Sequence, residues 1–213
     1  MNAQDFVRFM VSQNVLQFGR FTLKSGRESP YFFNLGNIAT GAALRQLGEA
    51  YAAVIEARAP EYDMLFGPAY KGIPIATATA VALARDVPVA FNRKEAKAHG
   101  EGGRFIGAPV EGRVLIVDDV LTAGTAVLEA KGMIEAAGAE VAGVVIALDR
   151  KEIVGDGQQS AVARMQNEHG VSVLSIVELE DVIEYLDAER AATEDDAGLV
   201  DDIRAYRARY CAV

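Results

Sequence analysis

Two adjacent aspartates, Asp118 and Asp119, end an apolar run and precede a cluster of small and hydroxylated residues. The whole segment, from Val114 to Ala126, reads VLIVDDVLTAGTA. An ionised carboxylate buried alone is strongly unfavourable, so we expect the pair at the rim of a sheet. Successive strand residues face opposite sides, which lets the two carboxylates accept hydrogen bonds from sugar hydroxyls or hold a hard cation.

The residues after the aspartates suit a phosphate group. Thr122 and Thr125 supply hydroxyls, Gly124 allows close backbone approach, and a starting helix offers free N–H groups. Acceptors for sugar hydroxyls beside donors for a phosphate together describe a site for a ribose phosphate.

Other interpretations of the acidic pair remain open at this point. Asp118, Asp119 and Thr122 are residue types that also cap strand-to-helix turns. A phosphoacceptor domain would need a further lysine on a later strand. A nucleotide-hydrolysing domain would need the pattern G-x-x-x-x-G-K-[ST], which the sequence lacks.

Cationic residues occur in two other segments of this acidic chain. Tyr70, Lys71 and Gly72 follow an apolar strand and precede a helix, so one cation and several N–H groups are aimed at an anion. A polar, glycine-rich interval at 92–109 carries Arg93, Lys94, Lys97 and His99. Such basic runs are usually solvated, but the flanking glycines favour a mobile lid that closes over an anionic substrate.

Alternating apolar strands and helices must position these residues. Strands are expected at 64–68, 87–91, 114–117, 141–148 and 171–179, and the main helices at 41–58, 73–85 and 125–137. This pattern predicts an α/β fold with a parallel sheet covered on both faces and a ligand site at the carboxyl ends of the strands. The helix at 73–85 is almost wholly apolar, so we expect it between other layers rather than at the surface.

Composition narrows the class of protein. The 213 residues are 51% apolar and 24% charged, as in a globular protein with one core. A net charge of -9 argues against a nucleic-acid-binding surface. The only cysteine is Cys211, so no intramolecular disulfide forms, and the N-terminus resembles neither a signal peptide nor a membrane span. We expect a cytoplasmic protein with no membrane partner.

The segment VLIVDDVLTAGTA resembles the phosphoribosyl diphosphate (PRPP) motif of the type I phosphoribosyltransferases. The resemblance implies a Rossmann-like core with a small N-terminal hood. It divides one phosphoribosyltransferase domain, 1–213, into a hood at 1–38 that contributes to the base site, a core at 39–186 and an acidic helical tail at 187–213. It also implies that the aspartates contact the ribose hydroxyls, and that the phosphate is held by the loop of Val120, Leu121, Thr122, Ala123, Gly124, Thr125 and Ala126.

Further stretches resemble the bacterial orotate phosphoribosyltransferase branch of this family. They are FTLKSGRESPYFFN at 21–34, LFGPAYKGIP at 65–74, FNRKEAKAHGEGG at 91–103 and LDR at 148–150. The implied reaction joins orotate and PRPP to give orotidine monophosphate and diphosphate, in the biosynthesis of pyrimidine nucleotides. Two rivals are a regulator that senses PRPP and an enzyme for another base. The first would carry an added nucleic-acid-binding segment, and the second is disfavoured by KSG and YFFN.

The resemblance assigns roles to individual residues. PRPP contacts beyond the motif loop fall to Lys24, Tyr70, Lys71, Arg93, Lys94, Lys97, His99, Asp118 and Asp119. The orotate site takes Lys24, Phe32, Phe33, Thr122 and Arg150, which offer an apolar wall for a flat ring and cations for its carboxylate. Lys97, His99, Asp118 and Asp119 are the implied catalytic residues.

The chemistry so implied needs charge placement rather than a protein nucleophile. Loss of diphosphate puts positive charge on the ribose ring and negative charge on the leaving group, so cations and Mg²⁺ should carry catalysis. Mg²⁺ binds phosphate oxygens and keeps its waters, so the aspartates need not be strict ligands. The resemblance further implies a homodimer in which the lid, Arg93 to Gly103, is shared across the interface.

Overall fold

The computed structural model describes residues 1–23, 26–94, 103–155, 157–193 and 197–212, and its centre is a six-stranded sheet of order β5-β4-β3-β6-β7-β8. Five strands run parallel, and these are β3 (Met64–Gly67), β4 (Val89–Asn92), β6 (Arg113–Val117), β7 (Glu140–Asp149) and β8 (Val173–Glu178). The predicted parallel α/β sheet is therefore confirmed.

The sixth strand, β5 (Phe105–Gly107), forms the edge of the sheet and pairs antiparallel with β4. The prediction of a loop throughout 92–109 is wrong at this point. Phe105 packs edge-on against Phe66 with 5.9 Å between ring centroids, so an apolar contact draws the end of the polar interval onto the sheet.

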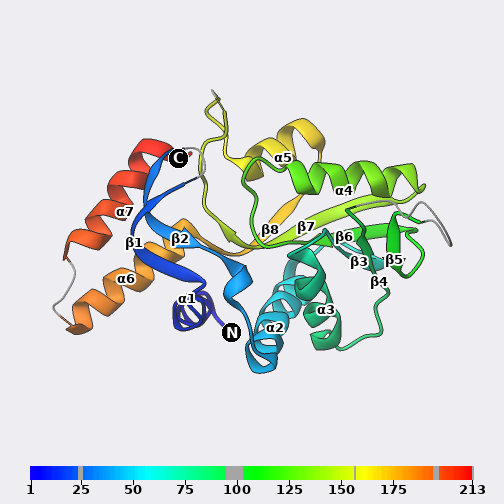
Figure 1. Cartoon of the computed structure of the whole chain (residues 1–213), viewed down its shortest axis with the longest axis horizontal. Coiled ribbons are helices and arrows are strands. Elements are labelled where there is room, and N and C mark those ends of the chain that lie inside the picture. The colour runs from blue at the N-terminus through cyan, green and yellow to red at the C-terminus, as the bar shows by residue number, and fades with distance from the viewer. Residues whose placement is uncertain (24–25, 95–102, 156, 194–196, 213) are drawn as a thin grey trace.

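Alternating strand residues divide the core into two clusters. Leu65, Leu115 and Val145 join the cluster under α2 (Gly41–Arg58) and α3 (Gly72–Ala82). Their neighbours Phe66, Ile116 and Ile146 join the opposite cluster under α4 (Thr125–Ala136) and α5 (Ala161–His169). Figure 1 shows the two helix pairs on opposite faces of the sheet. The sheet is thus covered on both faces, as parallel strands require.

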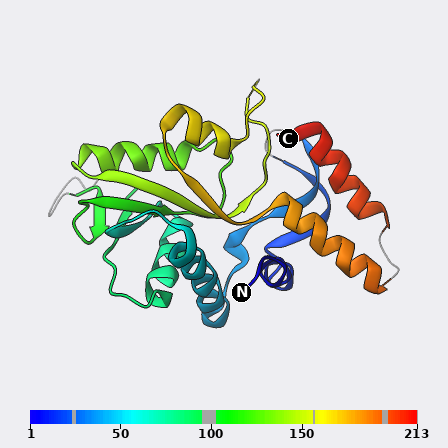
Figure 2. The same cartoon turned by 180° about the vertical axis from the view of Figure 1, so that it is seen from behind.

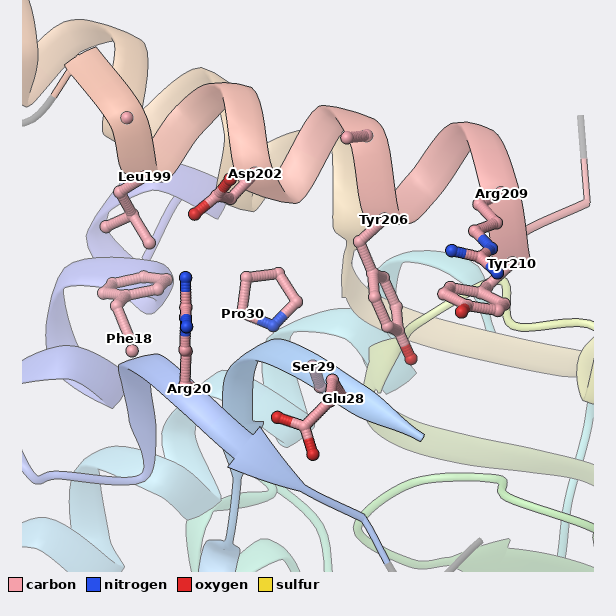
Figure 3. A pocket seen from close by; sticks show the side chains of 13 residues that line it. Phe18, Arg20, Glu28, Ser29, Pro30, Leu199, Asp202, Tyr206, Arg209 and Tyr210 are labelled. Carbon is pink, nitrogen blue, oxygen red and sulfur yellow. The ribbon is translucent and has the colours of Figure 1, made fainter. Parts of the chain in front are cut away.

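The two ends of the chain pack together. The N-terminal unit consists of α1 (Ala3–Ser12), the antiparallel strands β1 (Leu16–Thr22) and β2 (Glu28–Phe33), and the short 3₁₀ helix η1 (Leu35–Asn37). The C-terminal helices α6 (Leu179–Thr193) and α7 (Ala197–Tyr210) lie beside it in both views (Figures 1 and 2). A groove of about 680 Å³ separates the β1–β2 hairpin from α7 (Figure 3).

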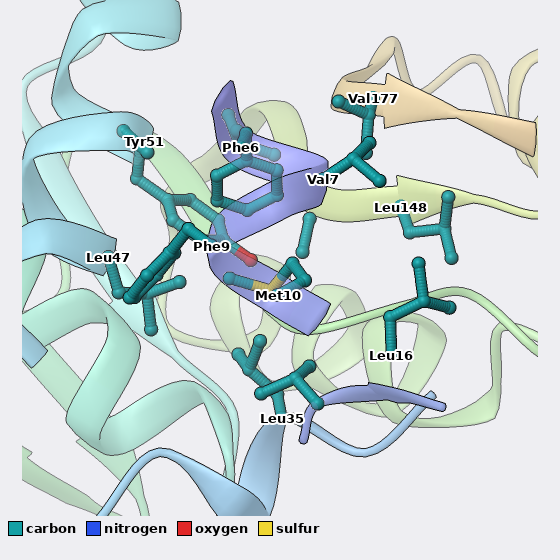
Figure 4. Close-up of a cluster of buried hydrophobic side chains, with 14 of the residues drawn as sticks. Phe6, Val7, Phe9, Met10, Leu16, Leu35, Leu47, Tyr51, Leu148 and Val177 are labelled. Carbon is teal, nitrogen blue, oxygen red and sulfur yellow. The ribbon is translucent and has the colours of Figure 1, made fainter. Parts of the chain in front are cut away.

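The N-terminal unit shares its core with the sheet. Phe6 and Met10 of α1 are buried in one cluster with Leu47 of α2, Leu148 of β7 and Val177 of β8 (Figure 4). The unit is therefore anchored by burial of large apolar side chains. Within the ranges described, no helix is long and apolar enough to cross a membrane.

Helix α3 does not lie between layers of this chain, contrary to expectation. It covers one side of the sheet, and its outer face is open, with Val81 83% exposed. A groove between α2 and α3 is lined by Leu44, Pro74, Ala78 and Val81, among others. The helices nearly touch, since a Cβ added at Gly48 would lie 2.3 Å from the carbonyl oxygen of Ala78. An apolar helix thus leaves an apolar face uncovered.

Candidate active site

The carboxyl ends of neighbouring parallel strands carry most of the predicted site residues. Lys71 follows β3, Arg93 and Lys94 follow β4, the aspartates follow β6, and Arg150 follows β7. Parallel strands end at one edge of the sheet, so the topology gathers these residues there. The predicted residues Lys24, Lys97 and His99 lie outside the described residues.

The two aspartates are largely buried, and their side chains have different partners. Asp118 and Asp119 are each 7% exposed, and each accepts a hydrogen bond from the next backbone N–H, that of Asp119 at 2.9 Å and that of Val120 at 2.8 Å. The second oxygen of Asp119 binds Lys71 Nζ at 2.7 Å. Burial, and then the charge of Asp119, raise the pKa of Asp118 to about 7, against the opposing effect of Lys71. Asp119 is thus paired with a cation, whereas Asp118 ionises only near neutral pH.

Tyr51 of α2 supports the turn that carries the two aspartates. Its side chain, on α2, is completely buried, and its hydroxyl donates to the carbonyl oxygen of Asp118 at 2.8 Å. Sequence reasoning assigned Tyr51 no role beyond its place in the helix expected at 41–58. The residue type carried a signal, because a tyrosine hydroxyl that is buried requires a hydrogen-bond partner.

We expect Tyr51→Phe to lower the free energy of unfolding by about 1–2 kcal/mol, because the buried carbonyl oxygen of Asp118 loses its donor. The displaced turn should also raise the apparent Kd for PRPP several-fold. Urea unfolding and a PRPP titration measure the two effects. Thr79→Val is the control, since it removes a buried hydroxyl that donates to the Ile75 carbonyl within α3. Unchanged PRPP affinity in Tyr51→Phe would contradict a role for this hydroxyl at the site.

Backbone contacts shape the segment that presents Tyr70 and Lys71. A Cβ added at Gly67 would lie 2.3 Å from the carbonyl oxygen of Gly72, so this turn closes only without a side chain there. The Ala69 N–H donates to Asn92 Oδ1 at 2.7 Å, which ties the end of β3 to that of β4. Sequence reasoning missed Asn92, because nothing in its neighbourhood showed which strand end it would face.

The described cations after β4 lie close to this segment. The ring of Tyr70 is 72% exposed and stands 5.8 Å from Lys94 Nζ. Arg93 and Lys94 also line a hollow of about 400 Å³ together with Arg104. The structure thus brings Tyr70 to Lys94 and Lys71 to Asp119.

The loop after the acidic pair leaves the start of α4 open. Gly124 precedes the helix with φ +75°, and within the described residues no side chain caps its first turn. Thr122 and Thr125 are exposed. The interpretation of Thr122 as a helix cap is therefore wrong. Open N–H groups beside two hydroxyls can bind a phosphate.

The predicted base-site residues differ in exposure. Phe33 packs against the core, whereas Phe32 is 38% exposed and stacks on Phe21 with 5.5 Å between centroids. The Arg150 side chain is 14% exposed, and within the described chain its buried Nε has no hydrogen-bond partner. An accessible ring and an arginine with a free donor are consistent with a planar, negatively charged ligand.

Comparisons with known proteins agree with this geometry. A model of the phosphoribosyl transferase domain matches residues 35–169. The orotate phosphoribosyltransferase of Marinobacter nauticus is 55% identical over 210 residues, which cover 97% of each chain. A crystal structure of the orotate phosphoribosyltransferase of Francisella tularensis superposes with a TM-score of 0.84 at 41% identity, covering 98% of this chain and all of that one. That of Mycobacterium tuberculosis in complex with PRPP gives a TM-score of 0.66 at 25% identity, over 84% of this chain and 98% of the other.

Proposed function

The chain belongs to the phosphoribosyltransferase family and, within it, to the orotate phosphoribosyltransferases, and from this membership we propose how its residues divide the reaction. The enzyme transfers the phosphoribosyl group of PRPP to orotate and releases diphosphate, giving orotidine monophosphate. Identity of 55% over nearly the full length of a relative of that name carries this conclusion. A PRPP-sensing regulator and an enzyme for another base have no comparable support.

PRPP is proposed to bind across the end of β6. Asp118 and Asp119 accept hydrogen bonds from the ribose hydroxyls, and the ribose phosphate lies on the loop of Val120, Leu121, Thr122, Ala123, Gly124, Thr125 and Ala126. The uncapped start of α4 supports this placement, because its N–H groups and helix dipole favour an anion.

The diphosphate is proposed to leave toward the cations beside the acidic pair. Tyr70, Lys71, Arg93 and Lys94 contact it from the ends of β3 and β4, and Lys97 and His99 from the lid. As the bond to the anomeric carbon breaks, negative charge grows on the leaving group, and fixed cations stabilise that charge. Lys71 exchanges part of its contact with Asp119 for a phosphate oxygen, since both lie within its reach.

Mg²⁺ is proposed to arrive with PRPP. No group of three or more His, Cys, Asp or Glu side chains that could hold a metal gathers in the described part of the chain. Mg²⁺ would be held mainly by PRPP oxygens and water, because it keeps several waters and needs few protein ligands, and Asp118 and Asp119 would face it without being strict ligands. When bound, Mg²⁺ neutralises the diphosphate oxygens.

Orotate is proposed to lie between the N-terminal hairpin and the ends of β6 and β7. Its ring rests against Phe32 and Phe33, Thr122 contacts its polar edge, and Lys24 and Arg150 bind its carboxylate. The partner-free Nε of Arg150 supports this assignment, because a buried donor without an acceptor is rare unless a ligand satisfies it.

A homodimer that shares its lids is proposed from the family together with the open face of α3. The apolar residues on that face, Val81 above all, would be covered by a second copy of the chain. The lid, Arg93 to Gly103, would then reach the neighbouring site. The division into hood, core and tail, and a cytoplasmic location, stay predictions.

Purified protein with PRPP and Mg²⁺ is expected to consume the ultraviolet absorbance of orotate and to release diphosphate in equal amount. Uracil, which lacks the carboxylate, should react at least about 100-fold more slowly in kcat/KM, because a site built for a charged group rejects a base without it. Absorbance traces with each base measure the ratio. Turnover of another base with none of orotate would refute the assigned specificity.

A further inference from the structure

Glu152 lies where three distant segments of the chain meet. Its Oε1 accepts hydrogen bonds from the hydroxyls of Tyr206 on α7, at 3.0 Å, and Tyr31 on β2, at 3.3 Å. Its Oε2 forms ion pairs with Arg150 at 3.5 Å and Arg27 at 3.8 Å. The Glu152 side chain is only 14% exposed. One carboxylate therefore links the end of β7, the N-terminal hairpin and the C-terminal helix.

The backbone at this point is held in an unusual conformation. Lys151, between Arg150 and Glu152, has φ +52°, which is disfavoured for a residue with a side chain. Its N–H donates to Asp149 Oδ1 at 2.8 Å. This turn allows the side chains of Arg150 and Glu152 to meet although they are two residues apart.

The end of α7 fixes the same turn from the other side. The N–H of Ala212 donates to the carbonyl oxygen of Lys151 at 2.8 Å, and the N–H of Ile153 donates to that of Tyr210 at 2.9 Å. Figure 3 shows Tyr206 projecting from α7 toward the hairpin. The C-terminal segment, for which the sequence showed no function, thus holds the backbone of Lys151 and Ile153 and binds the Glu152 side chain through Tyr206.

The contact with Glu152 restrains the Arg150 side chain but leaves some of its N–H donors free for another ligand. The pair is longer than a hydrogen bond, and the buried Arg150 Nε remains without a partner in the described structure. A guanidinium presents five donors in a planar fork. Glu152 therefore leaves donors free for a second carboxylate.

We propose that Glu152, held by Tyr206 of the C-terminal helix, is a positioning residue that orients Arg150 toward the carboxylate of orotate. The inference rests on the proposed assignment of Arg150 to that carboxylate. Loss of the Glu152 charge has two opposite effects: a more positive site attracts orotate, whereas a freed Arg150 must be ordered again on binding. We expect orientation to dominate, because an arginine released from Glu152 loses rotamer freedom each time orotate binds.

The decisive variant is Glu152→Gln, which keeps an acceptor for both tyrosine hydroxyls and replaces the oxygen that faces Arg150 and Arg27 by an uncharged N–H₂ group. We expect KM for orotate to rise about 5–10-fold, with kcat and KM for PRPP nearly unchanged, and the melting temperature to fall because two ion pairs are lost. Tyr206→Phe should raise KM for orotate about 2–3-fold. The matched control is Asp187→Asn, which breaks the 2.6 Å pair between α6 and Arg204 of α7, away from the turn at Lys151. It should leave KM for orotate unchanged.

The outcomes separate this inference from the function on which it rests. An unchanged or lower KM for orotate in Glu152→Gln would overturn the positioning role, as would an equal rise in Asp187→Asn. Arg150→Gln is measured alongside, with an expected rise of at least about 20-fold. If Arg150→Gln raises KM and Glu152→Gln does not, only the inference fails. If Arg150→Gln has no effect, the assignment of Arg150 fails as well.

Discussion

An Asp118→Asn variant is expected to lose about 100-fold in kcat/KM for PRPP and yet to be more stable than the parent at alkaline pH. The loss follows because an amide accepts a ribose hydroxyl less strongly than a carboxylate does, by about 2–3 kcal/mol. The gain follows from burial, which raises the pKa of Asp118 from an ordinary value of 3.8 to about 7. A carboxyl with a raised pKa stabilises the fold fully at low pH, and this contribution is lost as the pH rises through 7.

The stability advantage of Asp118→Asn should therefore grow with pH. Between pH 5.5 and 8.5 the cost of ionising Asp118 in the folded parent increases by about 2 kcal/mol, which widens the difference in melting temperature by about 4–8 °C. Thermal unfolding of parent and variant across this range measures it. Asp119→Asn is the matched control. It removes the partner of Lys71 together with the charge that repels Asp118, so it should reduce activity with a smaller stability gain at high pH than Asp118→Asn. A difference in melting temperature that does not vary with pH would refute the burial argument.

The different surroundings of Asp118 and Asp119 explain why two carboxylates lie side by side at the end of a buried strand. Asp119 is compensated by Lys71, and Asp118 remains a costly group in the free enzyme. A residue that destabilises the fold near neutral pH is consistent with selection for ligand binding rather than for stability. The ribose hydroxyls of PRPP would supply the donors that Asp118 lacks.

The features predicted correctly from the sequence are those encoded by local patterns. Alternating apolar strands and helices gave the parallel sheet, and the order of its carboxyl ends placed Lys71 near Asp119. Whether Thr122 caps the next helix could not be settled in this way, because capping depends on the conformation of Gly124. Motif resemblance supplied the ligand, which the pattern of residues alone left open.

Residues that act through long-range contacts were missed. Tyr51 and Asn92 each support the site from another element, and Glu152 joins segments more than 50 residues apart. A single sequence carries no signal of such pairs. The exposed face of α3 was missed for a different reason, since an apolar helix has the same composition whether its cover comes from its own chain or from a second copy.

If the lids are shared as proposed, combining two inactive variants should restore activity. Lys97→Ala alters the lid and Asp118→Asn alters the ribose site, so each homodimer should be nearly inactive. If each lid serves the neighbouring site, a heterodimer contains one site with both functions intact. Random mixing makes half of the dimers heterodimers, so activity should recover to about one quarter of that of the parent enzyme. Steady-state assays after co-expression or mixing measure the recovery, with native mass spectrometry to confirm heterodimers.

The same mixing experiment tests the open face of α3 as the contact between copies. If each lid served its own chain, every site of the heterodimer would be defective. Activity no higher than that of the two inactive homodimers would therefore refute lid sharing. Adding Val81→Asp to both variants should abolish the recovery, because a charge on an 83% exposed apolar position opposes burial against a second copy but is tolerated in a lone chain. Arg45→Gln is the control on the rim of the same groove, where Arg45 forms an exposed ion pair with Glu49 at 3.9 Å, and it should leave the recovery intact. Recovery that survives Val81→Asp would place the interface elsewhere.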